Sequence, residues 1–193
     1  WQRVTQRLQP GQSLDLDASL LSPYLAGTGE TQISLSSRPN LNVPALLEQL
    51  DRYPYGCLEQ TTSRALPLLY FNEVTQNWGG NQSPLTDIRE RVQKAIQRVL
   101  SMQKYSGGFG LWDENSAQEL WLSAYALDFL TRAKQMRYLL PKSAYQRGLD
   151  WLKQSLNDIG YKPDELAFRS YALYVLARAQ QAPLGDMRYL HDQ

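Results

Sequence analysis

The sequence contains a single cysteine, Cys57, and a glutamine, Gln60, follows it three positions later. A cysteine thiolate can attack the carbon of a glutamine carboxamide, expel ammonia and leave a thioester between the two side chains. Leu58 and Glu59 would be the spacers in the resulting ring. The spacing therefore allows an electrophile that is built from two side chains and needs no cofactor.

The residues around Cys57 place it at the expected start of a helix. Pro54 and Gly56 favour a sharp turn before the cysteine, and the stretch 58–76 is a candidate helix. In a helix that starts near Cys57, residues 57 and 60 stand one turn apart and within reach of each other. The helix dipole and the unpaired amide groups of the first turn would also stabilise a thiolate.

Two other interpretations of Cys57 stay open on spacing alone. A lone cysteine beside a helix is usually a small buried hydrophobic side chain, and a C-x-x-Q pattern by itself is weak. A cysteine-protease nucleophile needs a histidine base, whereas the only histidine of the chain is His191, close to its last residue. The protease interpretation is therefore the less favoured of the two.

The composition excludes several classes of protein. The 193 residues carry 20 basic and 19 acidic side chains, dispersed along the chain, which is not the charge pattern of a nucleic-acid-binding protein. No apolar run approaches the roughly 20 residues of a membrane span, so we expect no membrane contact from this segment. The sequence opens without methionine, and we expect it to be part of a longer protein.

A repeated helix pair is the main feature of the second half of the chain. The stretches "ELWLSAYALDFLTRA" at 119–133 and "ELAFRSYALYVLARA" at 165–179 share eight of fifteen positions, and 93–99 matches 146–152 more weakly. A pair that recurs at this period cannot bury its own apolar face and must stack on its neighbours. We therefore expect about six helices in an α/α array. The second helix of each pair is apolar almost all round and should be the inner one.

The first half of the chain has a mixed pattern. The stretch "TQISLSS" at 31–37 is typical of one strand. Helices are expected over 42–50 and over 86–103. In the second of these helices, one apolar stripe is formed by Ile88, Val92, Ile96, Val99 and Leu100.

The segment "YGCLEQTTSRALPLLYFNEV" resembles the thioester segment of the alpha-2-macroglobulin and complement superfamily, whose motif reads G-C-x-E-Q. The residues that match this segment are Gly56, Cys57, Glu59, Gln60 and Pro67. Leu58 stands where the animal proteins usually have glycine, and the form CLEQ is associated with bacterial members. The likeness continues through 106–130. It implies a mainly α fold: about half of an α/α toroid of six helix pairs over residues 41–193, preceded by the end of a CUB-like β segment and a linker over residues 1–40.

The resemblance also implies a function. Family members are protease inhibitors that trap a protease after it cleaves a bait segment elsewhere in the large protein; a lysine amine of the protease then attacks the acyl carbon of Gln60 and frees the thiol of Cys57. Gly56, Leu58 and Glu59 would support this motif. The reaction happens once per molecule, so we expect no enzyme. The expected partners are target proteases and the other domains of the same protein. Bacterial relatives are typically periplasmic and often lipid-anchored to the inner membrane.

Three further groups of residues have alternative interpretations. Tyr53 and Tyr55 either shield the thioester from water or simply pack the turn before Cys57. Trp112 and Trp121 are expected to fill the core. The glycines of "GGFG" at 107–110 are expected to turn one helix into the next, because no Lys-Ser/Thr follows them as in a phosphate-binding loop.

Two rival functions remain. Terpenoid cyclases and protein prenyltransferases share the α/α toroid, but they need an aspartate-rich motif or a zinc site. The acidic pairs of "WDEN" at 112–115 and "KPDE" at 162–165 are better explained as helix caps, so no metal site is expected. The other rival is a helical-repeat binding module with an inert cysteine.

Overall fold

The computed structural model describes residues 4–35 apart from 26, 29, 30, 32 and 34, then residues 56–70 and 85–192. The chain divides into two compact units, Trp1–Asn40 and Leu41–Gln193. In the first unit, a short 3-10 helix, η1 (Ala18–Leu21), is capped by Asp17, whose carboxylate accepts a hydrogen bond of 2.7 Å from the backbone of Ser19.

The strand expected over 31–37 is not confirmed. The structure describes only residues 31, 33 and 35 of this stretch and assigns none of them to a strand, while the other positions lie outside the described residues. The assignment of residues 1–40 to a CUB-like segment therefore stays a prediction.

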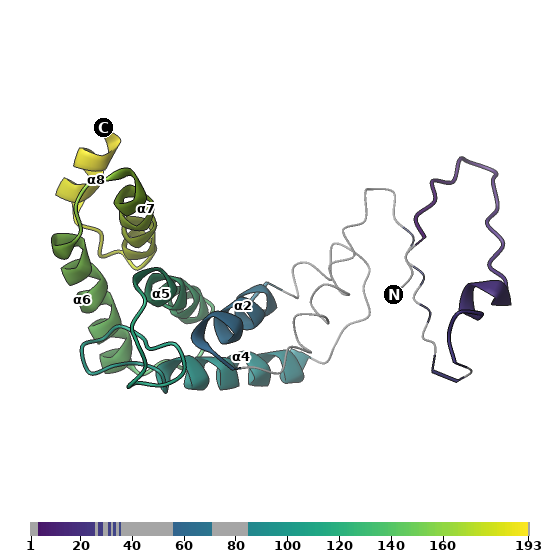
Figure 1. Cartoon of the computed structure of the whole chain (residues 1–193), viewed down its shortest axis with the longest axis horizontal. Coiled ribbons are helices and arrows are strands. Elements are labelled where there is room, and N and C mark those ends of the chain that lie inside the picture. Colours follow the sequence, from purple (N-terminus) through teal and green to yellow (C-terminus); the bar gives the residue numbers. More distant parts are fainter. Residues whose placement is uncertain are drawn as a thin grey trace. The chain divides into compact units, whose positions relative to one another are not determined.

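The second unit is helical (Figure 1). Its described α-helices are α2 (Leu58–Leu68), α4 (Leu85–Leu100), α5 (Leu120–Gln135), α6 (Lys142–Asp158), α7 (Pro163–Arg178) and α8 (Leu184–His191). Three of them (α4, α5 and α7) agree with the helices expected from the sequence, and α6 contains the weaker repeat at 146–152. α2 begins where the helix over 58–76 was expected but ends at Leu68, and residues 71–76 lie outside the described residues. The expected helix over 42–50 lies outside the described residues, and α8 was not expected. Within the described part of the chain, no helix is long and apolar enough to cross a membrane.

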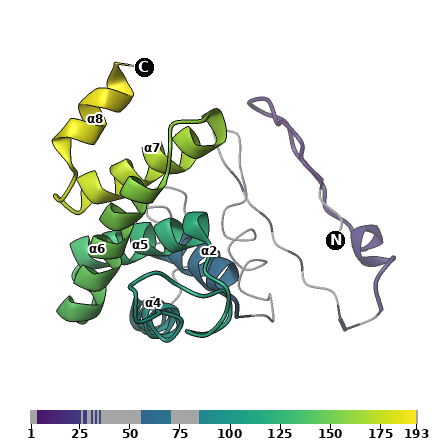
Figure 2. The same ribbon diagram turned by 60° about the vertical axis from the view of Figure 1, so that its left-hand side comes forward.

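Three helices form an inner row. α5 packs against α2 on one side and against α7 on the other, and both views show it between them (Figures 1 and 2). The three helices run in the same direction, since Ser63 of α2 meets Tyr125 of α5 near their starts, and Gln135 meets Arg178 of α7 near their ends. α4 packs on α2, and α6 lies against both α5 and α7. This arrangement confirms the expected α/α array with the second helix of each repeat inside.

Burial follows the sequence pattern. α5 is buried on most of its surface, whereas α4 buries only one stripe. That stripe includes Ile88, Val92, Ile96 and Val99, all buried, with Leu100 half-buried. Each such aliphatic side chain stabilises the fold by about 1.5–3 kcal/mol relative to exposure. The inner helices are therefore held by contacts from both sides.

A polar network joins the inner helices near their C-terminal ends. Asp128 is only 3% exposed, and its carboxylate accepts a 2.8 Å hydrogen bond from Nε of Arg132. The same guanidinium donates to the hydroxyl of Tyr70, in the turn just after α2 (2.9 Å), and to that of Tyr174 on α7 (2.8 Å). The hydrogen bond to Asp128 raises the pKa of Arg132 above its ordinary value, so the guanidinium stays charged. Arg178 adds an ion pair to Asp128 at 3.8 Å. One arginine thus ties all three helices together.

Candidate functional site

Cys57 and Gln60 share the first turn of α2. Cys57 is the N-cap residue, with an extended backbone (φ −69°, ψ 167°) and a side chain that is 6% exposed and makes no capping hydrogen bond. Leu58 and Glu59 are the first two helical residues, and Gln60 is the third. In a capping box, the side chains of the N-cap and the third helical residue each reach the backbone N–H of the other residue, so these two positions lie close together. The local geometry therefore suits a bond between these two side chains, although the thioester itself stays a prediction.

Arg98 holds the turn before the cysteine. Its Nε and Nη2 atoms donate to the carbonyl of Gly56 at 3.3 and 3.1 Å, and Nη2 also donates to the carbonyl of Trp112 at 3.0 Å. In addition, the backbone N–H of Leu58 donates to the carbonyl of Leu111 at 2.8 Å. The end of α4 and the loop after it thus fix the backbone on both sides of Cys57.

The loop between α4 and α5, residues 101–119, is itself rigidly built. Isolated antiparallel bridges pair Gln103 with Phe109 and Gly110 with Gln118. Gly107 has a φ of +105°, and a Cβ there would overlap the backbone carbonyl of Arg147 on α6. The glycines of this loop do turn one helix into the next, as expected, and one of them is required by close packing.

Buried polar atoms without partners gather in the first turns of α2. Among the described residues, neither Oε1 of Gln60 nor Oγ1 of Thr62 has a hydrogen-bond partner, and Thr62 is fully buried. An unpaired buried acceptor costs about 1–3 kcal/mol, so such groups are rare outside functional or strained sites. The carboxamide oxygen of Gln60 is therefore not engaged in holding the fold.

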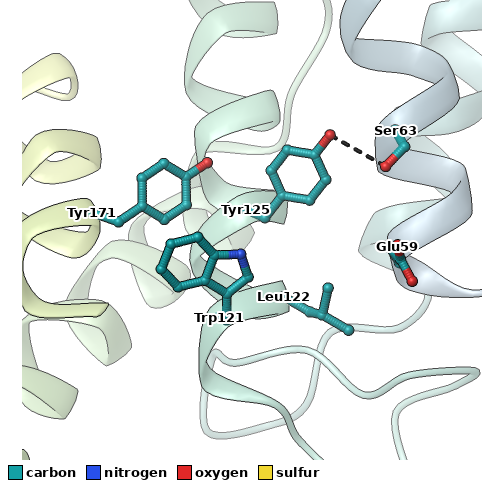
Figure 3. A pocket seen from close by; sticks show the side chains of 6 residues that line it. All are labelled: Glu59, Ser63, Trp121, Leu122, Tyr125 and Tyr171. Atoms are coloured by element: carbon teal, nitrogen blue, oxygen red, sulfur yellow. Dashed lines mark hydrogen bonds between the residues drawn. The ribbon is translucent and has the colours of Figure 1, made fainter. Parts of the chain in front are cut away.

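A cleft of about 420 Å³ opens beside the same turn (Figure 3). It lies among the three inner helices, and its lining residues are Glu59, Ser63, Trp121, Leu122, Tyr125 and Tyr171. The rings of Trp121 and Tyr171 stack with centroids 4.9 Å apart, and the hydroxyls of Ser63 and Tyr125 lie 3.3 Å apart. No motif of the sequence predicts this cleft, because its residues come from segments far apart in the chain.

Two expectations about single residues were wrong. Trp112 and Trp121 do not fill the core: they are 49% and 46% exposed. Trp112 lies in the loop, where its carbonyl accepts a hydrogen bond from Arg98, and Trp121 is the second residue of α5 and lines the cleft. Asp113 of "WDEN" caps no helix. It accepts hydrogen bonds from Ser116 and Asn115 within the loop, and these bonds lower its pKa.

Of the remaining expectations, one is confirmed and one lies outside the described residues. "KPDE" does begin a helix, with Pro163 in its first turn and the Glu165 carboxylate accepting from the backbone of Lys162 at 2.9 Å. Tyr53 and Tyr55 lie outside the described residues, so their shielding role stays a prediction. In the described ranges, no group of three histidine, cysteine or acidic side chains could hold a metal ion.

Known proteins match the chain over most of its length. The family model of the A-macroglobulin TED domain matches residues 31–173. An alpha-2-macroglobulin of Escherichia coli is 41% identical over 191 residues, which are 94% of this chain and 12% of that protein. The native E. coli protein, solved by cryo-electron microscopy, superposes with a TM-score of 0.73 at 38% identity, covering 95% of this chain and 12% of that one. The crystal structure of Salmonella alpha-2-macroglobulin reacted with methylamine gives a TM-score of 0.69 at 44% identity, covering 79% of this chain and 11% of that one.

Proposed function

The chain belongs to the alpha-2-macroglobulin family, as part of its TED domain, and on this premise we propose that Cys57 and Gln60 form an internal thioester that traps proteases. The described helices match the α/α toroid of that domain. The chain spans only 12% of its E. coli relative, so the activity of the whole protein is part of the proposal.

The observation that carries the proposal is the first turn of α2. Cys57 and Gln60 stand at the N-cap and the third helical position, and the Gln60 carboxamide oxygen is buried without a partner among the described residues. Attack of the Cys57 thiolate on the carboxamide carbon forms the C–S bond and breaks the C–N bond. The leaving nitrogen takes up a proton and departs as ammonia.

The trapping step consumes the thioester. A lysine amine of the protease adds to the acyl carbon of Gln60, the C–S bond breaks, and the sulfur of Cys57 takes the proton that the amine loses. The products are an amide at residue 60 and a free thiol at residue 57. Each molecule reacts once, so the protein acts as an inhibitor and not as an enzyme. The Salmonella relative was crystallised in a form reacted with methylamine, which supports an amine as nucleophile.

Several features of the complete protein belong to the same proposal. Bait cleavage elsewhere would expose the thioester, and Tyr53 and Tyr55 would shield it until then. A periplasmic location with a lipid anchor at the inner membrane is proposed from the family likeness alone. The cyclase-like and inert-module alternatives are not favoured, since the relatives found are alpha-2-macroglobulins.

The test is amine capture by the complete protein that contains this sequence. Labelled methylamine should be incorporated once per molecule, with release of one thiol. Cys57→Ala and Gln60→Ala should both abolish incorporation, because each removes one of the two atoms of the C–S bond. Uptake that persists unchanged in either variant would refute the assignment. As a matched control, Gln103→Ala alters a buried glutamine of the neighbouring loop and should leave incorporation intact.

A further inference from the structure

Glu59 brings a carboxylate to the cleft beside α2 (Figure 3). It is the only charged residue among the six that line the cleft, and within the described part of the chain its side chain has no hydrogen-bond or ion-pair partner. The polar groups around it are already engaged, since the Ser63 hydroxyl lies 3.3 Å from that of Tyr125 and the Tyr171 hydroxyl donates to Asp128 at 3.3 Å. The cleft therefore carries one uncompensated negative charge.

The opposite part of the cleft is aromatic. Trp121 stacks on Tyr171 with an interplanar angle of 24°, and about half of the Trp121 side chain stays exposed. The faces of such rings attract cations, and tryptophan does so most strongly. The apolar surface of the rings and of Leu122 also suits the methylene stem of a lysine, which prefers to cover apolar surface while its charge remains near a polar partner.

We propose that this cleft is a binding site for the ε-ammonium group of a lysine, which it captures at the first turn of α2, one residue from Gln60, before the two react. This proposal rests on the proposed function, and it states which nucleophiles the same site prefers. A carboxylate together with π faces recognises a primary alkylammonium ion and gives no such attraction to a neutral nucleophile.

The position of Glu59 makes the binding useful for the reaction. Glu59 and Gln60 are consecutive residues of the first turn of α2, with Cα atoms about 3.8 Å apart. Their side chains leave the helix in different directions, and Gln60 does not line the cleft, so a lysine held by Glu59 reaches the acyl carbon by swinging around the first turn. At neutral pH almost all lysines are protonated, since their pKa is about 10.4. The bound ammonium must therefore lose one proton, which the Glu59 carboxylate accepts. The neutral amine then attacks, the C–S bond breaks, and the Cys57 sulfur takes a second proton from the nitrogen.

The test compares two nucleophiles on the complete, thioester-containing protein. One is a blocked lysine, Nα-acetyl-lysine N-methylamide, and the other is methoxyamine, which is uncharged at neutral pH. We measure the release of the Cys57 thiol and express selectivity as the ratio of the two rate constants. Glu59→Gln and Trp121→Leu should each lower this ratio about threefold, and the double variant about tenfold, because the rate with the blocked lysine falls more than the rate with methoxyamine. Trp121→Phe should keep part of the selectivity.

Two controls make the outcomes decisive. Glu114→Gln, which removes an exposed carboxylate in the loop away from the cleft, should leave the ratio unchanged. Added salt should lower the ratio in the parent protein and have little effect in Glu59→Gln, because an exposed ion pair is screened. A ratio that stays the same in both cleft variants, or rates that fall equally for both nucleophiles, would overturn the proposal. If Glu59→Gln does not form the thioester, Trp121→Leu decides alone. A parent protein that reacts with neither nucleophile would instead refute the proposed function.

Discussion

The two ends of the inner row of helices differ in how their polar side chains are used. At the C-terminal end, Asp128 and Arg132 belong to a network in which charges are paired across α2, α5 and α7. At the N-terminal end of α2, the backbone is fixed by Arg98 and Leu111, but the side chains of Cys57 and Gln60 make no described hydrogen bonds that hold the fold. Paired polar side chains stabilise one end, whereas at the other end Leu58 is packed in the core and the hydrogen bonds are made to the backbone.

This difference explains how a reactive pair can be built into a stable helix array. Groups that are paired for stability are not free for chemistry, because breaking the pairs leaves buried polar atoms unsatisfied. The first turn of α2 leaves its reactive groups unpaired, and the rest of the inner row supplies the stability. Substitutions at the two ends should therefore separate folding from amine capture.

The largest effect on stability is expected for Asp128→Ala. The substitution removes the carboxylate to which Arg132 and Arg178 are paired and leaves their charges in a mostly buried site, so the free energy of unfolding should fall by about 3–5 kcal/mol. Asp128→Asn keeps the shape and one acceptor and should lose less. Urea unfolding followed by circular dichroism measures both. Loss of amine capture in properly folded Asp128→Asn would contradict the separation of the two ends.

A smaller effect on the free energy of unfolding, together with a change in thiol release, is expected for Arg98→Ala. It removes the charged donors from the carbonyls of Gly56 and Trp112, at a cost of about 1–2 kcal/mol. Because the turn before Cys57 is then less restrained, the thiol should be released faster in the absence of any protease. Arg98→Lys should not restore the parent rate, since an ammonium does not match the fork of a guanidinium. Arg89→Ala, which alters an arginine of the same helix that lies over Tyr138, is the matched control and should release thiol at the parent rate.

Cys57→Ser should abolish amine capture and yet stabilise the helix. Serine is a preferred N-cap residue, and its hydroxyl can accept from the backbone N–H groups of the first turn, which the cysteine does not do here. We expect a gain of about 0.5–1 kcal/mol in the free energy of unfolding. A clear loss of stability would show that the cysteine contributes to folding through its own packing.

The smallest effect concerns alkaline pH. Burial raises the pKa of Tyr171, and the nearby Asp128 carboxylate raises it further. Because the folded-state pKa exceeds the unfolded value of about 10, the contribution of this group is complete below about pH 10 and is lost as the pH rises towards the folded-state pKa. Stability should therefore decline above about pH 10, and less steeply in Tyr171→Phe. An identical decline in the variant would exclude Tyr171 as its source.

Much of the helical unit could be predicted from the sequence. Its periodicity and repeat predicted α4, α5 and α7. The spacing of Cys57 and Gln60 allowed a thioester, and the resemblance of the surrounding segment to a known motif identified them as the candidate pair. These signals are local, because helix geometry relates residues a few positions apart. The repeat in α5 and α7 also indicated the inner position of these helices.

The contacts that support the site could not be predicted in this way. Arg98 reaches Gly56 across 42 positions, and Arg132 reaches Tyr70 across 62. Such contacts depend on how helices pack, and no spacing rule relates their residues. Trp121 was wrongly placed in the core for the same reason: an apolar ring at this position favours burial unless a cleft lies beside it, and the sequence does not reveal the cleft.

The most direct test of the thioester is the intact mass of the native, complete protein. Formation of the bond between Cys57 and Gln60 expels one ammonia, so the measured mass should fall below the sequence mass by one ammonia and return to it after treatment with ammonia. Methylamine should instead raise it by one methylamine relative to the native form. Cys57→Ala should show its full calculated mass under all conditions. A native protein at its full sequence mass, with a free thiol at Cys57 before any treatment, would contradict the account.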